Sequence, residues 1–148
     1  MIFIPGWLVG IVTFPGIIIH ELGHLLLCRL AGVEVRGWCL FRLKSPQGFV
    51  IHEKTESVFK NFLVTFGPFF VNSVLTILLT LVFILVKEAF PLNTFLFWLA
   101  ISVGAHSFPS RGDGKNLWNS TIESLKKKRV WNAVFLPFVT LIYAGALL

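Results

Sequence analysis

The sequence predicts an all-α polytopic membrane protein with four transmembrane helices and a small β-hairpin at the cytoplasmic surface between the first two. Of its 148 residues, 55% are hydrophobic and only 14% are charged, whereas a soluble domain is usually about 25% charged. The mean hydropathy is +0.81, which excludes a disordered chain and an ordinary water-soluble globule. The apolar stretches reach the ~20 residues that a helix needs to cross a bilayer. We expect one membrane-embedded domain over residues 1–148, with helices over residues 5–28, 61–86, 90–109 and 130–147.

The first apolar stretch is expected to be a helix of the protein itself and not a signal peptide. No basic residue precedes it, and no small-residue cleavage site follows it. The last stretch contains Pro137, which interrupts its apolar pattern. We still expect it to cross the membrane as the fourth helix.

The basic residues predict the direction of the helices. Of the 13 lysines and arginines, six lie between the first and second stretches, six lie between the third and fourth, and only Lys87 lies between the second and third. Positively charged links stay in the cytoplasm, so both termini are expected outside the cell membrane. The basic run at residues 126–129 is expected to anchor the fourth helix at anionic headgroups, with the lipid bilayer and not a nucleic acid as its partner.

A β-hairpin is predicted over residues 33–52. This segment is rich in strand-forming residues, and Ser45-Pro46-Gln47-Gly48 has the composition of a turn. Two roles are compatible with the pattern. The hairpin could be a packed cap over the helix ends, or its open edge could capture an extended peptide by β-addition.

The chemistry of the chain is expected at His20-Glu21-Leu22-Gly23-His24. Residues four apart share one face of a helix, so His20 and His24 can present two imidazoles to one metal ion. Glu21 is then placed to act as a general base. Ionisable residues inside a membrane span are costly and usually functional. The competing interpretation is a buried polar cluster that holds helices together, or a helix end at the interface.

A catalytic zinc site usually has three protein ligands, and Asp113 is the candidate for the third. The predicted topology places Asp113 and the histidines at the cytoplasmic ends of their helices, and Glu88 on the opposite side. The flanking Gly112 and Gly114 permit tight backbone turns at this aspartate. An ordinary exposed loop turn would also favour this composition.

These motifs resemble the site-2 protease family of intramembrane zinc metalloproteases. The resemblance covers roughly residues 15–116 and begins with the histidine motif on the first core helix. The family's Asn-x-x-Pro-x-x-x-Leu-Asp-Gly-like motif is partly matched by residues 106–114, with Pro109 and Asp113 in corresponding places. In this chain His106 replaces the asparagine, Gly112 replaces the leucine, and the spacing is one residue shorter. Residues 67–72, which include Gly67-Pro68 and Asn72, resemble the family's Gly-Pro-x-x-Asn element with one extra residue.

The resemblance implies a Zn²⁺ ion bound by His20, His24 and Asp113, with Glu21 as the catalytic base. By the same resemblance His106 is a candidate catalytic residue that steadies the scissile carbonyl. It could instead be an alternate metal ligand or a partner that orients Asp113. Asn72 is a candidate substrate-binding residue, or a hydrogen-bonding link between helices.

The expected function is that of a zinc-dependent intramembrane metalloendopeptidase. Its substrate would be a membrane protein or membrane-associated peptide, cleaved near the cytoplasmic face. The alternative is a non-proteolytic relative of the same fold that binds or regulates a partner protein. A transporter is less compatible with the sequence, because the outer halves of the second and third stretches contain almost no polar residues.

Overall fold

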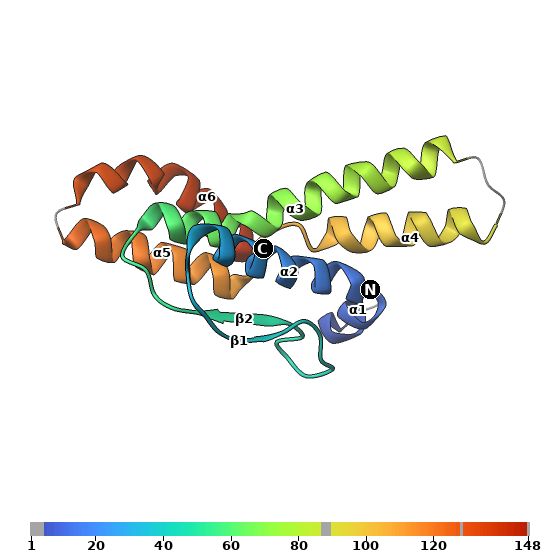
Figure 1. Ribbon diagram of the computed structural model, residues 1–148, viewed down its shortest axis with the longest axis horizontal. Coiled ribbons are helices and arrows are strands. Elements are labelled where there is room, and N and C mark those ends of the chain that lie inside the picture. Colours follow the sequence, from blue (N-terminus) through green and yellow to red (C-terminus); the bar gives the residue numbers. More distant parts are fainter. Residues whose placement is uncertain (1–4, 87–89, 128, 148) are drawn as a thin grey trace.

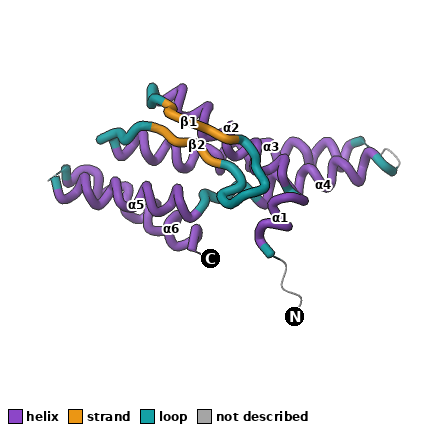
Figure 2. The backbone as a smooth tube through the Cα atoms, turned by 90° about the horizontal axis from the view of Figure 1, so that it is seen from below, coloured by secondary structure: helices purple, strands orange, loops and turns teal. Residues whose placement is uncertain are grey.

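The computed structural model describes residues 5–86, 90–127 and 129–147. The chain is mostly helical and contains one small antiparallel sheet, as predicted. Figure 1 shows an elongated molecule with α2 and the sheet in its middle. One helical hairpin, α3–α4, extends to one end, and a second, α5–α6, extends to the other; the view in Figure 2 agrees. The elements are α1 (Gly6–Val12), α2 (Phe14–Ala31), β1 (Val35–Cys39), β2 (Phe49–His52), α3 (Val58–Leu85), α4 (Leu92–Ala105), α5 (Arg111–Lys126), the 3₁₀ helix η1 (Val130–Phe135) and α6 (Leu136–Leu147).

The single helix predicted over residues 5–28 is wrong, because α1 and α2 are separate helices that meet at Thr13. The backbone of Thr13 leaves the helical region, with φ −110° and ψ 29°. Pro15 explains the break. In one continuous helix the nitrogen of Pro15 would have no N–H to donate to the carbonyl four residues earlier, whereas the first turn of a new helix needs no such donor. α2 therefore starts next to this proline.

The predicted hairpin is confirmed, although its loop is longer than the predicted four-residue turn. β1 pairs with β2 from Val35 opposite His52 to Cys39 opposite Phe49. The connecting residues 40–48 run back along α2 towards α1 (Figure 2). There Gln47 donates a hydrogen bond to the carbonyl of Trp7, 3.1 Å away. The hairpin thus lies along the side of α2 and does not only cover its end.

Two helices, α2 and α3, are long and apolar enough to cross a membrane. With 28 residues, α3 is about 42 Å long at 1.5 Å per residue. The helices α4 and α6, with 14 and 12 residues, are shorter than the ~20 residues of a full crossing. The helix predicted over 130–147 is divided into η1 and α6. Pro137 lies at the start of α6, where the missing N–H of a proline is tolerated best.

The amphipathic helix α5 is not predicted by the sequence pattern, which places its residues in the link between the third and fourth apolar stretches. Its buried residues include Leu117 and Thr121, and Leu117 forms a small core with Val139 and Ile142 of α6. The N-cap residue Ser110 begins α5 in a reciprocal capping arrangement with the third helical residue. Such a cap is typically worth about 1 kcal/mol. This cap also fixes the side chain of that third residue, which is Asp113.

Candidate metal centre

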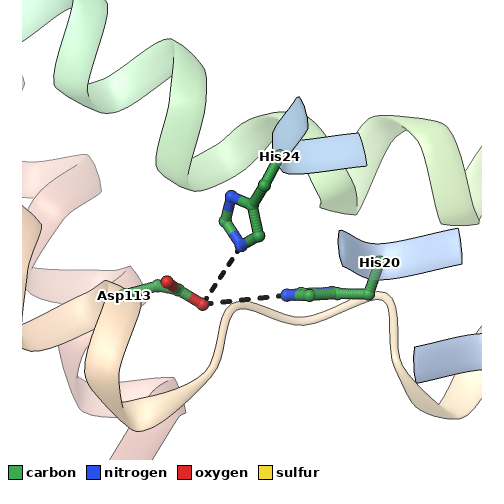
Figure 3. Close-up of side chains that lie close together, drawn as sticks. All are labelled: His20, His24 and Asp113. Atoms are coloured by element: carbon green, nitrogen blue, oxygen red, sulfur yellow. Dashed lines mark ion pairs between the residues drawn. The ribbon is translucent and has the colours of Figure 1, made fainter. Parts of the chain in front are cut away.

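The structure brings together the three residues that were predicted as metal ligands. His20 and His24 lie one turn apart on α2, and Asp113 lies in the first turn of α5 (Figure 3). Their ligand atoms all lie within 4.8 Å of one another. Asp113 Oδ2 is 3.3 Å from His24 Nε2 and 3.7 Å from His20 Nε2. Segments about 90 residues apart in the sequence therefore meet at one point.

The geometry of this cluster could hold a metal ion. Zinc bonds of ~2.0–2.1 Å at tetrahedral angles separate ligand atoms by about 3.3 Å, close to the two distances from Asp113 Oδ2 to the histidines. His20 Nδ1 donates to the carbonyl of His106 at 2.7 Å, and His24 Nδ1 donates to the carbonyl of Val64 at 2.9 Å. Metal-ligating histidines usually donate their second ring N–H in this way. His20 Nε2 is buried and has no hydrogen-bond partner among the described residues.

Asp113 is positioned by a helix cap and not by a glycine turn, which corrects the loop geometry expected from Gly112 and Gly114. Both glycines lie within α5, and in the described ranges the one glycine with positive φ is Gly32. Asp113 Oδ2 accepts from the N–H of Ser110 at 3.1 Å and from its hydroxyl at 2.6 Å. The cap therefore holds the carboxylate at a defined distance from α2.

The charge of Asp113 also suits a cation. Burial by itself would raise the pKa of this carboxyl group. The neighbouring His20 and His24 side chains and the hydroxyl of Ser110 outweigh that effect and hold the pKa of Asp113 well below its ordinary value. The group is therefore a carboxylate at neutral pH.

Glu21 lies on α2 between the two histidines and is 8% exposed. Its side chain packs against Gly48, the last residue of the hairpin loop. A Cβ atom at position 48 would lie 2.8 Å from Glu21 Oε1 and 2.7 Å from its Cγ, closer than real Cβ atoms approach. Only glycine lets the hairpin backbone come this close to the carboxylate.

His106 and Asn72 lie outside the cluster of ligand atoms. His106 follows the last residue of α4, and its ring Nε2 is 2.7 Å from the hydroxyl of Thr13. In the part of the chain that the structure describes, the candidate metal group consists of His20, His24 and Asp113 and does not include the His106 ring. The hydrogen bonds described for that ring do not reach Asp113, so an orienting role toward the aspartate has no direct contact to support it.

Asn72 is completely buried in α3 and makes contacts to backbone atoms. Its side-chain amide donates towards the carbonyls of Gly16, Val103 and His106, at 3.4, 3.2 and 3.0 Å. These bonds link α2, α3 and α4. They agree with the predicted alternative role of Asn72 as a hydrogen-bonding link between helices. One of its acceptors, the His106 carbonyl, is the same atom that receives the His20 hydrogen bond.

Several residues of the centre were not found from the sequence. The capping residue Ser110 had a detectable signal, because a serine followed three residues later by an acidic residue is typical of a helix start. Gly48 and the carbonyl of Val64 had none, since their roles depend on where the backbone passes.

Comparison of the chain with protein-family models, with curated proteins and with solved structures found no match.

Proposed function

We propose that this chain is an intramembrane zinc metalloendopeptidase similar to the site-2 proteases. One observation carries the proposal: two histidines and one carboxylate converge, with each histidine held through Nδ1 and each Nε2 facing the carboxylate. Two histidines and a carboxylate form a common ligand set of hydrolytic zinc sites. A buried carboxylate, that of Glu21, lies between the two histidine ligands in the sequence.

When bound, zinc would lower the pKa of a water molecule towards ~7 and polarise the carbonyl of a peptide bond. His20, His24 and Asp113 would hold the ion. Glu21 accepts the proton of the attacking water and later delivers it to the nitrogen of the leaving amine. The peptide bond is thereby exchanged for a carboxylate and an amine.

The membrane setting is proposed from the apolar helices. The helices α2 and α3 would cross the bilayer, and α4 and α6 would cross together with the apolar residues beside them, over 90–109 and 130–147. On α3 and α4 many large apolar side chains are exposed, among them Ile77, Leu81, Leu85, Phe95 and Ile101. Contact with lipid tails, which are as apolar as these side chains, would remove them from water.

The proposed direction of the chain predicts the accessibility of its ends. Both termini and the connection between α3 and α4 should lie outside the cell membrane, and the hairpin and the α5–α6 connection should lie in the cytoplasm. Single cysteines introduced at Ser45 and near the C-terminus can be probed with a membrane-impermeant maleimide on intact cells. Labelling of the C-terminal cysteine alone is expected. Labelling at Ser45 would contradict the orientation.

The substrate has to be locally unwound, because a helix keeps its backbone carbonyls in hydrogen bonds. We propose that the edge of the β1–β2 sheet binds this extended segment by β-addition. The contact between Gly48 and Glu21 connects the sheet directly to the general base. A peptide paired with the sheet would therefore lie close to the carboxylate that acts on it.

A methyl group at Gly48 is expected to lower cleavage about 100-fold, because a misplacement of ~1 Å at a catalytic group can cost that much. In Gly48→Ala the new Cβ would displace Glu21 or the hairpin, while the zinc ligands keep their positions. Gly37→Ala, in the same hairpin, is the matched control, since a Cβ there meets nothing within 4 Å. Initial cleavage rates and zinc content would be measured for both variants. Equal rates in Gly48→Ala and Gly37→Ala would contradict the proposed role of this contact.

The proposed function is tested with the full chain reconstituted in liposomes with zinc and a panel of single-span membrane proteins. Mass spectrometry of the products is expected to show cleavage within or next to a membrane-spanning segment. Removal of zinc by a chelator should abolish the cleavage, and added zinc should restore it. Cleavage that persists without metal would overturn the proposed chemistry, and zinc binding with no cleavage of any panel member would favour the partner-binding relative.

A further inference from the structure

The hydrogen bond that orients His24 depends on a carbonyl without its usual helical partner. In an α-helix the carbonyl of one residue accepts the N–H of the residue four positions later. For Val64 that residue is Pro68, the one proline inside α3, and proline has no N–H to donate. The Val64 carbonyl accepts from His24 Nδ1 instead, at 2.9 Å. Both groups are buried, so neither would otherwise be satisfied by water.

The carbonyl that orients His20 is free for a similar reason. The helix α4 ends just before His106. Three positions later stands Pro109, which has no N–H, and four positions later the N–H of Ser110 is taken by Asp113 Oδ2 at 3.1 Å. The His106 carbonyl is therefore left to accept from His20 Nδ1, at 2.7 Å. The short segment between α4 and α5 thus contacts two of the three candidate ligands, one through a carbonyl and one through a cap.

A second donor fixes the position of the His106 carbonyl. The side-chain amide of Asn72 lies 3.0 Å from the same oxygen that His20 contacts. It also reaches the carbonyls of Gly16 and Val103, so it ties the start of α2 and the end of α4 to α3. Asn72 has no solvent exposure, so its amide is enclosed among these backbone carbonyls.

From these contacts we infer that Pro68 and Asn72 are positioning residues for the two histidine ligands, each acting through a backbone carbonyl. A neutral imidazole whose Nδ1 donates a hydrogen keeps its lone pair on Nε2, the atom that faces Asp113 in both rings. The two residues would thus select the tautomer that can bind the ion. The inference rests on the proposed zinc site and assigns a task to the Gly-Pro and asparagine element of α3.

Pro68→Ala tests the first half of the inference. The alanine N–H would compete with His24 for the Val64 carbonyl, so the dissociation constant for Zn²⁺ is expected to rise ~10–100-fold, as on loss of other partners of metal ligands. The melting temperature of the metal-free protein should be maintained or raised, because an interior proline disfavours the helix. Pro137→Ala, at the start of α6, is the control and should leave zinc affinity unchanged. A fall of both stability and affinity would identify Pro68 as a packing residue and overturn this role.

Asn72→Leu tests the second half, with Asn61→Leu as its matched control. Asn61 is also a buried asparagine of α3, and its amide donates to the carbonyl of Thr55 at 3.0 Å, away from the metal centre. Both variants should lower the melting temperature by similar amounts. Only Asn72→Leu should weaken Zn²⁺ binding, by ~10-fold or more, and change the visible absorption spectrum of bound Co²⁺. Equal zinc affinities in the two variants would overturn the role of Asn72.

A measurement on the unmodified protein keeps the inference testable even where a variant fails to fold. In metal-free protein labelled with ¹⁵N-histidine, NMR at alkaline pH is expected to find both His20 and His24 in the Nδ1–H tautomer. The Nε2–H tautomer in either ring would overturn the inference. If the unmodified protein binds no zinc, the proposed function fails. If it binds zinc as tightly as Pro68→Ala and Asn72→Leu do, the proposed function stands and the inference alone fails.

Discussion

Replacement of Glu21 by glutamine is expected to lower the rate of peptide-bond cleavage by ~10²–10⁴-fold, the usual contribution of a general base. Zinc should remain bound. Glutamine keeps the size of the side chain and still fits against Gly48, but its amide cannot accept the proton of the attacking water. Glu21 is not one of the three residues whose ligand atoms converge. The cleavage rate should therefore fall while the zinc content, measured on the same preparation, stays the same.

Glu34→Gln provides the control for this substitution. Glu34 is an exposed carboxylate just before β1, away from the metal centre. The same change of charge there should leave the cleavage rate within about twofold of the unmodified protein, as is usual for surface substitutions. Undiminished cleavage by Glu21→Gln would refute the assigned role of this carboxylate.

Substitution of Asp113 by asparagine is expected to weaken zinc binding by more than ~100-fold, since loss of even an indirect partner of a metal ligand costs 10–100-fold. The pKa of Asp113 lies below its ordinary value, so the substitution removes a full negative charge at neutral pH. Asparagine can still accept the two hydrogen bonds from Ser110 that begin α5. The helix should remain capped, and the loss should concern the metal.

Two further variants separate the metal from the helix cap. Asp113→Ala should lose zinc and also lower the stability of the metal-free protein, by less than the ~1 kcal/mol of a whole cap, because only the half of the reciprocal cap made by the Asp113 side chain is lost. Glu123→Gln, at an exposed position of the same helix, should change neither quantity. Competition with a chelator gives the zinc affinity, and thermal unfolding gives the stability. Zinc affinity that is equal in the unmodified protein and in Asp113→Asn would rule out the aspartate as a ligand.

The sequence predicted those parts of the fold that depend on apolar runs and turns. The hairpin was found because strand-forming residues flank a proline- and glycine-containing turn, and α3 was found to within a few residues because its apolar run is uninterrupted. Hydropathy alone could not locate the break at Thr13, since Pro15 lies within a continuous apolar run. It also missed α5, whose polar face outweighs its few buried residues; the cap at Ser110 was the available signal.

For the site, helical spacing was enough to pair His20 with His24. Asp113 required the topology and the family resemblance, because an aspartate between glycines is ordinary in loops. The hydrogen bonds that orient the two histidines could not be predicted from the sequence. The bonds to the carbonyls of Val64 and His106 depend on where the backbone passes, and a sequence does not state which carbonyls are free.

The most direct test of the proposed centre is the zinc content of the purified, detergent-solubilised protein after equilibration with a small excess of Zn²⁺ and removal of unbound metal. Elemental analysis is expected to find about one zinc per chain, the number that one three-ligand site binds, and almost none in His24→Ala. A folded protein that retains no zinc, or that retains as much with His24→Ala as without it, would contradict the account.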